Sequence, residues 1–233
     1  MFGEPNGPTE DALVRWIEDS LATGSHRLGA GYQGQTLLYA DPSGPRYVIK
    51  VPHGRGLRRW LSTLMLRHEA RVYARIEGLS GFARCYGLLR NQYLVLQYVA
   101  GESARSVRFV DRENFFAELL ACIQALHSRG IAHSDLQKKD NLLVVAGRHP
   151  ILLDLGAAVI RKNGFAPFNA WHFQFARRLD FNQYIKLKYR KRYEQMSEAD
   201  RALFRRTLLE KVARALKRFG RWLSTGSPDR RRR

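Results

Sequence analysis

Two segments of the chain decide its fold: HSDLQKKDNLL, residues 133–143, and LLDLG, residues 152–156. Each joins acidic residues to a run of apolar residues, a pattern typical of a polar loop beside a short buried strand. Together they contain three aspartates, Asp135, Asp140 and Asp154, and one asparagine, Asn141. Carboxylate and amide oxygens are ligands that Mg²⁺ prefers, and a carboxylate also accepts protons. The two segments therefore mark a candidate catalytic site.

A glycine-rich motif, Gly29-Ala30-Gly31-Tyr32-Gln33-Gly34, lies near the start of the chain. In a dinucleotide-binding unit such a motif opens a helix after a strand. Here a strand pattern at 35–41 follows instead, and a turn signal leads to a further strand at 46–51. The context favours a glycine hairpin whose backbone amides lie against phosphates, and the alternative is an ordinary glycine-containing hairpin.

A lysine and a glutamate accompany the hairpin. Lys50 ends the segment Tyr47-Val48-Ile49-Lys50, and Glu69 follows nineteen residues later on a helix expected over 57–77. A lysine that is held by a carboxylate keeps its orientation toward a phosphate. Taken by themselves, the two residues would read as a surface ion pair.

In their order along the chain, these motifs resemble the protein-kinase-like superfamily. The resemblance covers about residues 26–157: glycine loop, lysine, glutamate, a connecting segment at 97–99, and then the segments that contain Asp135 and Asp154. It implies a two-lobed α+β fold, with a small antiparallel-sheet N-lobe and a reduced, mostly helical C-lobe. It also implies ATP and Mg²⁺ as cofactors and transfer of the γ-phosphoryl group to an acceptor hydroxyl.

The resemblance assigns a role to each matching residue. Asp135 is the proton acceptor, and Asn141 and Asp154 hold the metal ion. Lys50, oriented by Glu69, holds the α- and β-phosphates. The nucleotide is expected to contact the following residues: Gly29, Gly31, Gly34, Val48, Lys50, Gln97 and Val99.

The sequence departs from the family pattern at several positions. Ser134 replaces an arginine that anchors a phosphorylated loop in regulated protein kinases, so we expect this chain not to need that switch. Asn141 stands six positions after Asp135 rather than five, which makes Asp140 a rival metal ligand. Gln137 stands where a lysine is usual, so Lys138 or Lys139 is expected to contact the γ-phosphate, with Lys138 the preferred residue.

Hydrophobic patterning divides the chain into four parts: an N-terminal helix (1–25), an N-lobe (26–99), a C-lobe (100–224) and a basic tail (225–233). Further elements are expected as follows: helices at 9–23, 111–129 and 197–223, and strands at 26–32, 83–89, 92–98, 142–146 and 151–154.

The short C-lobe narrows the family resemblance. A C-lobe of this length resembles those of small atypical kinases: lipopolysaccharide core kinases of the Kdo/WaaP group, RIO-like kinases and aminoglycoside phosphotransferase-like enzymes. Residues 176–201 are similar to the C-terminal helices of the lipopolysaccharide kinases, so a sugar hydroxyl of the lipopolysaccharide core is the first expectation for the acceptor. A small RIO-like serine/threonine protein kinase and a catalytically inert binding module are the alternatives.

The chain is strongly basic, with 40 Lys and Arg against 21 Asp and Glu among 233 residues. The excess is concentrated in residues 157–233, where 21 basic residues face 6 acidic ones. This charge predicts an anionic partner: a lipopolysaccharide or protein acceptor, together with a peripheral contact to an anionic membrane surface. Nucleic acid is not expected, because no nucleic-acid-binding motif accompanies the charge.

The location of the protein follows from what its sequence lacks. Two cysteines are too few for a disulfide framework, the first residues do not have the pattern of a secretory signal, and no apolar run in the sequence is long enough to span a membrane. These features predict a cytoplasmic protein, peripheral at the inner face of the cytoplasmic membrane.

Overall fold

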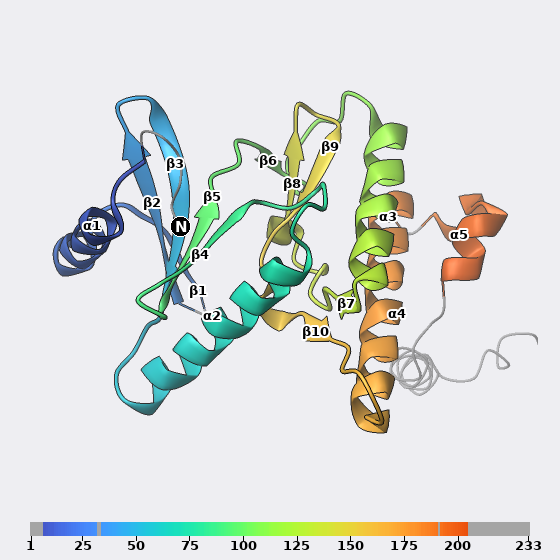
Figure 1. Cartoon of the computed structure of the whole chain (residues 1–233). Coiled ribbons are helices and arrows are strands. Elements are labelled where there is room, and N and C mark those ends of the chain that lie inside the picture. The colour runs from blue at the N-terminus through green and yellow to red at the C-terminus, as the bar shows by residue number, and fades with distance from the viewer. Residues whose placement is uncertain (1–6, 32–33, 191, 205–233) are drawn as a thin grey trace, which may run out of the picture.

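The computed structural model describes residues 7–31, 34–190 and 192–204. The fold is of the mixed α+β class, with an antiparallel sheet near the N-terminus and several helices, as expected for a small kinase-like fold (Figure 1). Among these residues, no helix is both long and apolar enough to cross a membrane. The domain boundaries expected at 25 and 99 stay predictions, and the one at 224 lies outside the described residues.

Five antiparallel strands form the main sheet, in the order β1-β2-β3-β5-β4. Their bounds are Arg27–Gly31 for β1, Gly34–Asp41 for β2, Gly44–Val51 for β3, Cys85–Leu89 for β4 and Tyr93–Gln97 for β5. The turn between β2 and β3 is fixed by the Asp41 side chain, whose Oδ1 accepts a hydrogen bond from Ser43 N at 2.8 Å. All five strands that the sequence predicts in this region are present. Their observed ends differ from the predicted ends by a few residues.

Alternation along β3 assigns its side chains to two faces of the sheet. Tyr47, Ile49 and Val51 are buried, and they pack against helix α1 (Glu10–Thr23). Val48 and Lys50 point to the opposite face, because successive residues of a strand alternate. The strand therefore directs Lys50 away from α1 and toward the rest of the molecule.

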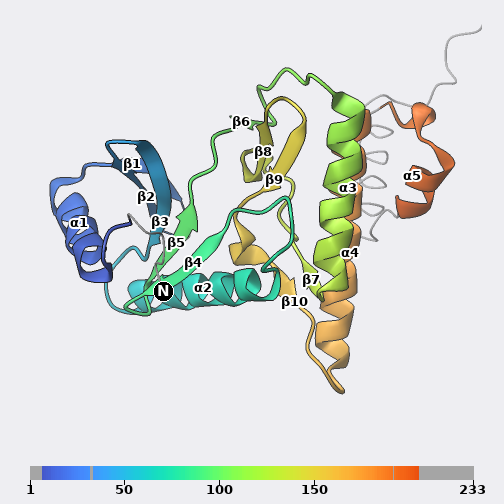
Figure 2. The same ribbon diagram turned by 45° about the horizontal axis from the view of Figure 1, so that its top comes forward.

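Helix α2 (Leu57–Arg75) covers the other face of the sheet, where Leu66 and Val72 pack with Leu94 and Leu96 (Figure 2). The same apolar cluster includes Leu126, Ile131 and Leu155 from the second half of the chain. Helix α2 is thus the element that joins the sheet to the helix-rich part of the molecule.

Two long helices, α3 (Arg112–Ser128) and α4 (Pro167–Tyr189), lie side by side in the helix-rich part (Figures 1 and 2). The remaining elements are β6 (Glu102–Ser103), β7 (Ile131–Ala132), η1 (Lys139–Asn141), β8 (Leu142–Val145), β9 (His149–Leu152), η2 (Leu155–Ala157), β10 (Val159–Ile160), η3 (Tyr193–Gln195) and α5 (Glu198–Leu203). Strands β6, β8 and β9 form one small sheet, and β7 and β10 form another. Both small sheets flank the two motif segments, residues 133–143 and 152–156.

Two expectations about these elements need correction, and one long helix was not expected. The strand expected at 151–154 ends at Leu152, because Asp154 has a positive φ of 58° that a strand does not tolerate. The helix expected over 197–223 is capped by Ser197 as predicted, but it ends at Leu203. Phe204 is extended, and its ring stacks on Tyr193; residues beyond it lie outside the described part. No bounds were expected for α4, although it is the longest helix described.

Candidate active site

One lysine connects the two halves of the molecule. Lys50 Nζ donates to Glu69 Oε1 at 2.7 Å and to Glu69 Oε2 at 2.9 Å, and it also reaches Asp154 Oδ1 at 2.9 Å. Lys50 lies on β3, Glu69 on α2 and Asp154 just before η2. Leu155 N donates to Glu69 Oε1 at 3.2 Å, which ties the same carboxylate to the η2 backbone. Three segments far apart in the sequence therefore converge on one ammonium group.

Burial and charge act against each other in this cluster. Burial alone would lower the pKa of Lys50, but the carboxylates of Glu69 and Asp154 outweigh it and raise that pKa above its ordinary value. Burial raises the pKa of Glu69, with Lys50 opposing the shift. Burial would also raise the pKa of Asp154, yet the Lys50 ammonium outweighs burial and holds that pKa below its ordinary value. Lys50 and Asp154 are therefore held in their charged forms.

The segment 133–143 forms a loop in which Asp135, Lys138 and Asn141 meet. Lys138 Nζ lies 2.6 Å from Asp135 Oδ2. Asn141 Nδ2 donates to the backbone oxygen of Asp135 at 3.0 Å and lies 3.4 Å from its Oδ2. Because the amide nitrogen of Asn141 is used inside the loop, its side-chain oxygen remains available for another partner.

Asp140 and Asn141, the two rivals for a metal ion, have different surroundings. Asn141 is buried, whereas the side chain of Asp140 is 65% exposed. Asp140 Oδ1 accepts from Ser103 Oγ at 3.2 Å, and its Oδ2 lies 3.2 Å from Arg105. Both carboxylate oxygens of Asp140 thus have partners on the β6 side of the loop.

Asp180, to which the sequence argument gave no role, anchors the same loop from α4. Its carboxylate is fully buried and accepts from the backbone nitrogens of His133 and Ser134, each at 2.8 Å, and from His127 Nε2 at 2.9 Å. Asp180 is also the only acidic residue between Asp154 and Glu194 in a strongly basic segment. A single acidic residue in such a basic segment was the one feature of the sequence that could have pointed to a role for Asp180.

His133 and Ser134 complete the anchoring of the loop. His133 Nε2 lies 2.9 Å from Leu153 O, which joins the loop to the segment before Asp154. Ser134 Oγ donates to Ala157 O at 2.6 Å. The side chain that replaces the usual arginine therefore binds the neighbouring backbone directly, and the His133 ring holds the loop against the segment before Asp154.

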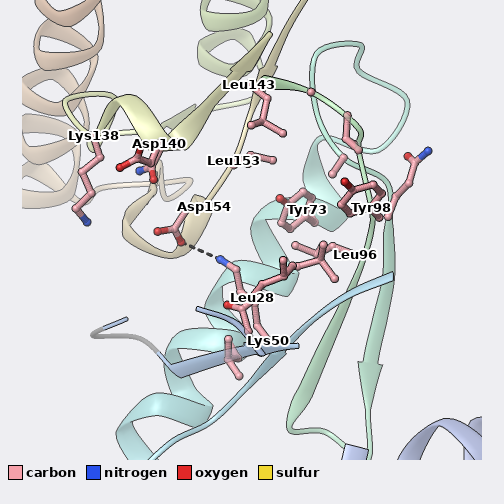
Figure 3. Close-up of a pocket in the computed structure, with 18 of the residues that line it drawn as sticks. Leu28, Lys50, Tyr73, Leu96, Tyr98, Lys138, Asp140, Leu143, Leu153 and Asp154 are labelled. Atoms are coloured by element: carbon pink, nitrogen blue, oxygen red, sulfur yellow. Dashed lines mark hydrogen bonds and ion pairs between the residues drawn. The ribbon is translucent and has the colours of Figure 1, made fainter. Parts of the chain in front are cut away.

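A cavity of about 680 Å³ separates the sheet from the helix-rich part (Figure 3). Of the residues singled out in the sequence, it is lined by Val48, Lys50, Gln97, Val99, Lys138, Asp140, Asn141 and Asp154. Glu69 and Asp135 are outside the lining, but each contacts a residue within it. In Figure 3, Lys50 reaches up from the sheet to Asp154, while Lys138 and Asp140 lie on the opposite wall.

The glycine motif forms a hairpin, as predicted. Gly29 and Gly31 lie in β1, Gly34 begins β2, and Gly31 pairs with Gly34 across the two strands. Tyr32 and Gln33, at the tip, lie outside the described residues. Leu28 and Thr36, from the two strands of the hairpin, line the cavity.

Most of the apolar lining was not predicted from the sequence. It comprises Leu28, Leu66, Ala83, Leu96, Leu143 and Leu153, together with Tyr73 and Tyr98. Tyr73 is unusual because its hydroxyl is buried without a hydrogen-bond partner among the described residues. These residues come from separate strands and helices, so no local motif in the sequence identifies them as neighbours.

Known proteins provide limited similarity. No protein-family model matches the chain. It is 29% identical over 144 residues to serine/threonine-protein kinase D of Synechocystis sp., 45% identical over 74 residues to serine/threonine-protein kinase sck2 of Schizosaccharomyces pombe, and 33% identical over 82 residues to a probable serine/threonine-protein kinase of Dictyostelium discoideum.

These alignments cover 56%, 29% and 30% of this chain, and 28%, 11% and 19% of the respective relatives. The chain thus matches less than a third of the length of each relative. The three similarities support a place in the protein-kinase-like superfamily, and they favour neither the lipopolysaccharide core kinases nor the RIO-like kinases.

Proposed function

We propose that the chain is an ATP-dependent kinase that transfers the γ-phosphoryl group of ATP to an acceptor hydroxyl. The observation that carries the proposal is the position of Lys50, whose ammonium binds Glu69 and Asp154 at the edge of a large cavity. Phosphoryl transfer needs positioned charges more than covalent chemistry from the protein. A lysine held between two carboxylates, next to a third carboxylate in a neighbouring loop, supplies such charges.

The oxygen donors at the cavity fit a magnesium ion. Asp154 Oδ1 binds Lys50, which leaves its second oxygen, and Asn141 retains its side-chain oxygen. Mg²⁺ typically takes one or two protein oxygens and completes its shell with phosphates and water. We assign Asn141 and Asp154 as its ligands over Asp140, because both oxygens of Asp140 already have partners. When bound, the ion would neutralise the charge of the phosphates.

The remaining residues have separate tasks in this proposal. Lys50 holds the α- and β-phosphates, and Glu69 keeps its ammonium in place. Asp135 accepts the proton of the acceptor hydroxyl as that oxygen attacks the γ-phosphorus. Lys138 is bound to Asp135, and its half-exposed side chain lines the cavity, so it is placed to move onto the γ-phosphate.

The adenine is assigned to the apolar part of the cavity, between Val48 and Leu143 and against the backbone of 97–99. The nitrogens of Gln97 and Tyr98 donate to Arg84 O and Arg46 O. Among the described residues, no backbone hydrogen bond from Val99 N is found. Val99 N is thus the donor at this edge with capacity for a purine.

The relatives and the sequence pattern point to different acceptors. The names of the three relatives favour a serine or threonine hydroxyl of a protein. A sugar hydroxyl of the lipopolysaccharide core, expected from the short C-lobe and the basic last third, has no counterpart among them and stays a prediction. An inert binding module is disfavoured because Lys50, Asp135, Asn141 and Asp154 all lie in or beside the cavity.

A transfer assay tests the proposal. The chain would be incubated with γ-labelled ATP and Mg²⁺, separately with generic protein acceptors and with lipopolysaccharide core. Label on either acceptor, lost in Asp135→Asn, supports a kinase and identifies the acceptor class. Failure of the chain to bind ATP under any Mg²⁺ or Mn²⁺ condition would favour the inert module.

A further inference from the structure

Three large aromatic side chains protrude where α4 begins. Phe165 is 99% exposed, Phe168 is 88% exposed and Trp171 is 69% exposed. We call these residues the aromatic tip. In Figure 2 the start of α4 projects below the other labelled elements, far from the start of α3. Exposed single apolar residues are common, but three large ones within seven residues indicate an interaction site.

The aromatic tip is held in a defined shape. Asn169 Oδ1 accepts from Lys162 N at 2.7 Å, and Asn169 Nδ2 donates to Ile160 O at 3.0 Å. These bonds fasten the connecting loop to the first turn of α4. Trp171 also stacks on Phe175, with ring centroids 5.8 Å apart. These contacts therefore hold in place the backbone that carries the three aromatic side chains.

A second apolar stripe lies at the start of α2. Leu57, Trp60, Leu61 and Met65 are exposed and recur at helical spacing, so they share one face. In both ribbon views α2 lies along the same lower edge of the molecule from which α4 projects. The opposite end of α2 contacts the loop that leads to α4, because the Arg75 side chain donates to Arg161 O at 3.5 Å.

The surroundings of both clusters carry one sign of charge. Residues 55–75 contain six arginines and a single acidic residue, Glu69, which is buried and paired with Lys50. Residues 155–179 contain four basic residues and no acidic ones. An exposed apolar surface rimmed by arginine and lysine matches the interface of an anionic bilayer, where rings enter the headgroup layer and cations meet phosphates.

We propose that the aromatic tip and the α2 stripe dock the protein onto an anionic lipid bilayer. The inference does not depend on catalysis. A second copy of the chain is a poorer occupant because two such faces would bring arginines together. Residues 205–233 are a poorer occupant for the same reason, since they contain eleven Lys or Arg against two acidic residues.

The test is co-sedimentation of the full chain with lipid vesicles. Vesicles of phosphatidylcholine alone are compared with vesicles that contain about 30% phosphatidylglycerol, at about 0.1 M and about 0.5 M NaCl. High salt is essential because any basic protein binds anionic vesicles by charge alone, and salt screens that contribution. Binding that persists at high salt reports insertion of apolar side chains.

The decisive variant combines Phe165→Ser, Phe168→Ser and Trp171→Ser. We expect its partition coefficient at high salt to fall by at least about tenfold. The matched control is Val110→Ser, which removes an 80% exposed apolar side chain just before α3 and should bind like the wild type. Arg161→Gln with Lys162→Gln should weaken binding about tenfold at low salt only. Because every substituted side chain is exposed, thermal unfolding should be unchanged in all variants.

An independent readout is quenching of tryptophan fluorescence by lipids brominated on the acyl chains. The quenching should be smaller in Trp171→Phe than in the wild type. The proposal is overturned if the wild type does not bind at high salt, or if the tip variant binds as well as Val110→Ser. It is also overturned if light scattering finds dimers that depend on the aromatic tip while vesicles capture nothing.

Discussion

The molecule carries two lysine–carboxylate clusters beside one cavity. They differ in the exposure of their lysines and in the distance between their members along the chain, although the side chains of Asp154 and Asp135 are similarly exposed, 26% and 21%. Lys50, Glu69 and Asp154 come from three distant segments, and the Lys50 side chain is only 15% exposed. Asp135 and Lys138 are three residues apart in one loop, and the Lys138 side chain is 61% exposed. The first cluster therefore depends on the tertiary structure, because it joins three separate segments, whereas the second forms within a single loop.

The difference teaches which contacts can rearrange when a nucleotide enters. Removing one partner of a buried pair leaves an uncompensated charge, so the Lys50 cluster resists change. An exposed pair contributes little to stability, and water readily replaces either partner. We therefore assign positioning to the Lys50 cluster and movement to Lys138.

The largest expected effect comes from Asp154, which belongs to the buried cluster and is also a proposed ligand of the metal ion. Asp154→Asn should lower turnover by about 10³- to 10⁵-fold, the scale of losing a charge that stabilises the transferring phosphoryl group. Asp140→Asn is the matched control in a steady-state transfer assay, because Asp140 is paired with Arg105. Equal losses in the two variants would refute the preference for Asn141 as the metal ligand.

Asp135→Asn tests the exposed cluster next. Loss of the proton acceptor should lower turnover by about 10²- to 10⁴-fold while the affinity for ATP stays near that of the wild type. Single-turnover kinetics and nucleotide titration measure the two quantities separately. A variant with nearly wild-type turnover would show that another group accepts the proton.

Glu69→Gln and Lys138→Met separate the two clusters by stability. Glu69→Gln should lower the free energy of unfolding by about 1–3 kcal/mol, because the buried Lys50 loses a charged partner but keeps Asp154. Lys138→Met should change that free energy by less than about 0.5 kcal/mol, yet lower turnover about tenfold or more. Urea denaturation and the transfer assay provide both values. The assigned difference between the clusters would be wrong if Lys138→Met were the more destabilising change.

A smaller effect concerns pH. The folded-state pKa of Asp154 lies below its ordinary value, so its charge stabilises the fold above the unfolded pKa and loses that contribution as pH falls. The difference in unfolding free energy between the wild type and Asp154→Asn should be constant near neutral pH and shrink below about pH 4. Urea midpoints across this range measure it. A difference that grows on acidification would contradict the ion pair.

The motifs predicted which charged side chains meet at the cavity better than they predicted the residues that surround them. Lys50, Glu69 and Asp154 were found because each lies in a short pattern with fixed order, and the structure brings them together. Asp180 was missed because two of its partners are backbone nitrogens and the third, His127, is 53 residues away in the sequence, so no local pattern displays these contacts. Tyr73 was missed because the helical pattern of α2 identifies a buried position but not the cavity behind it.

The sequence also predicted the wrong end for the helix that begins after Ser197, and for a different reason. Its apolar period continues past residue 204, so local periodicity favours a continuous helix. The stacking of Phe204 on Tyr193 instead accompanies an extended backbone at Phe204. A tertiary contact between aromatic rings thus coincides with the end that periodicity did not predict.

The most direct test of the central claim is a crystal structure with Mg²⁺ and a non-hydrolysable ATP analogue. The account predicts the triphosphate at Lys50, the ion on Asp154 and Asn141, and the adenine beside Val99. A nucleotide bound outside this cavity, or a triphosphate that makes no contact with Lys50, would contradict it.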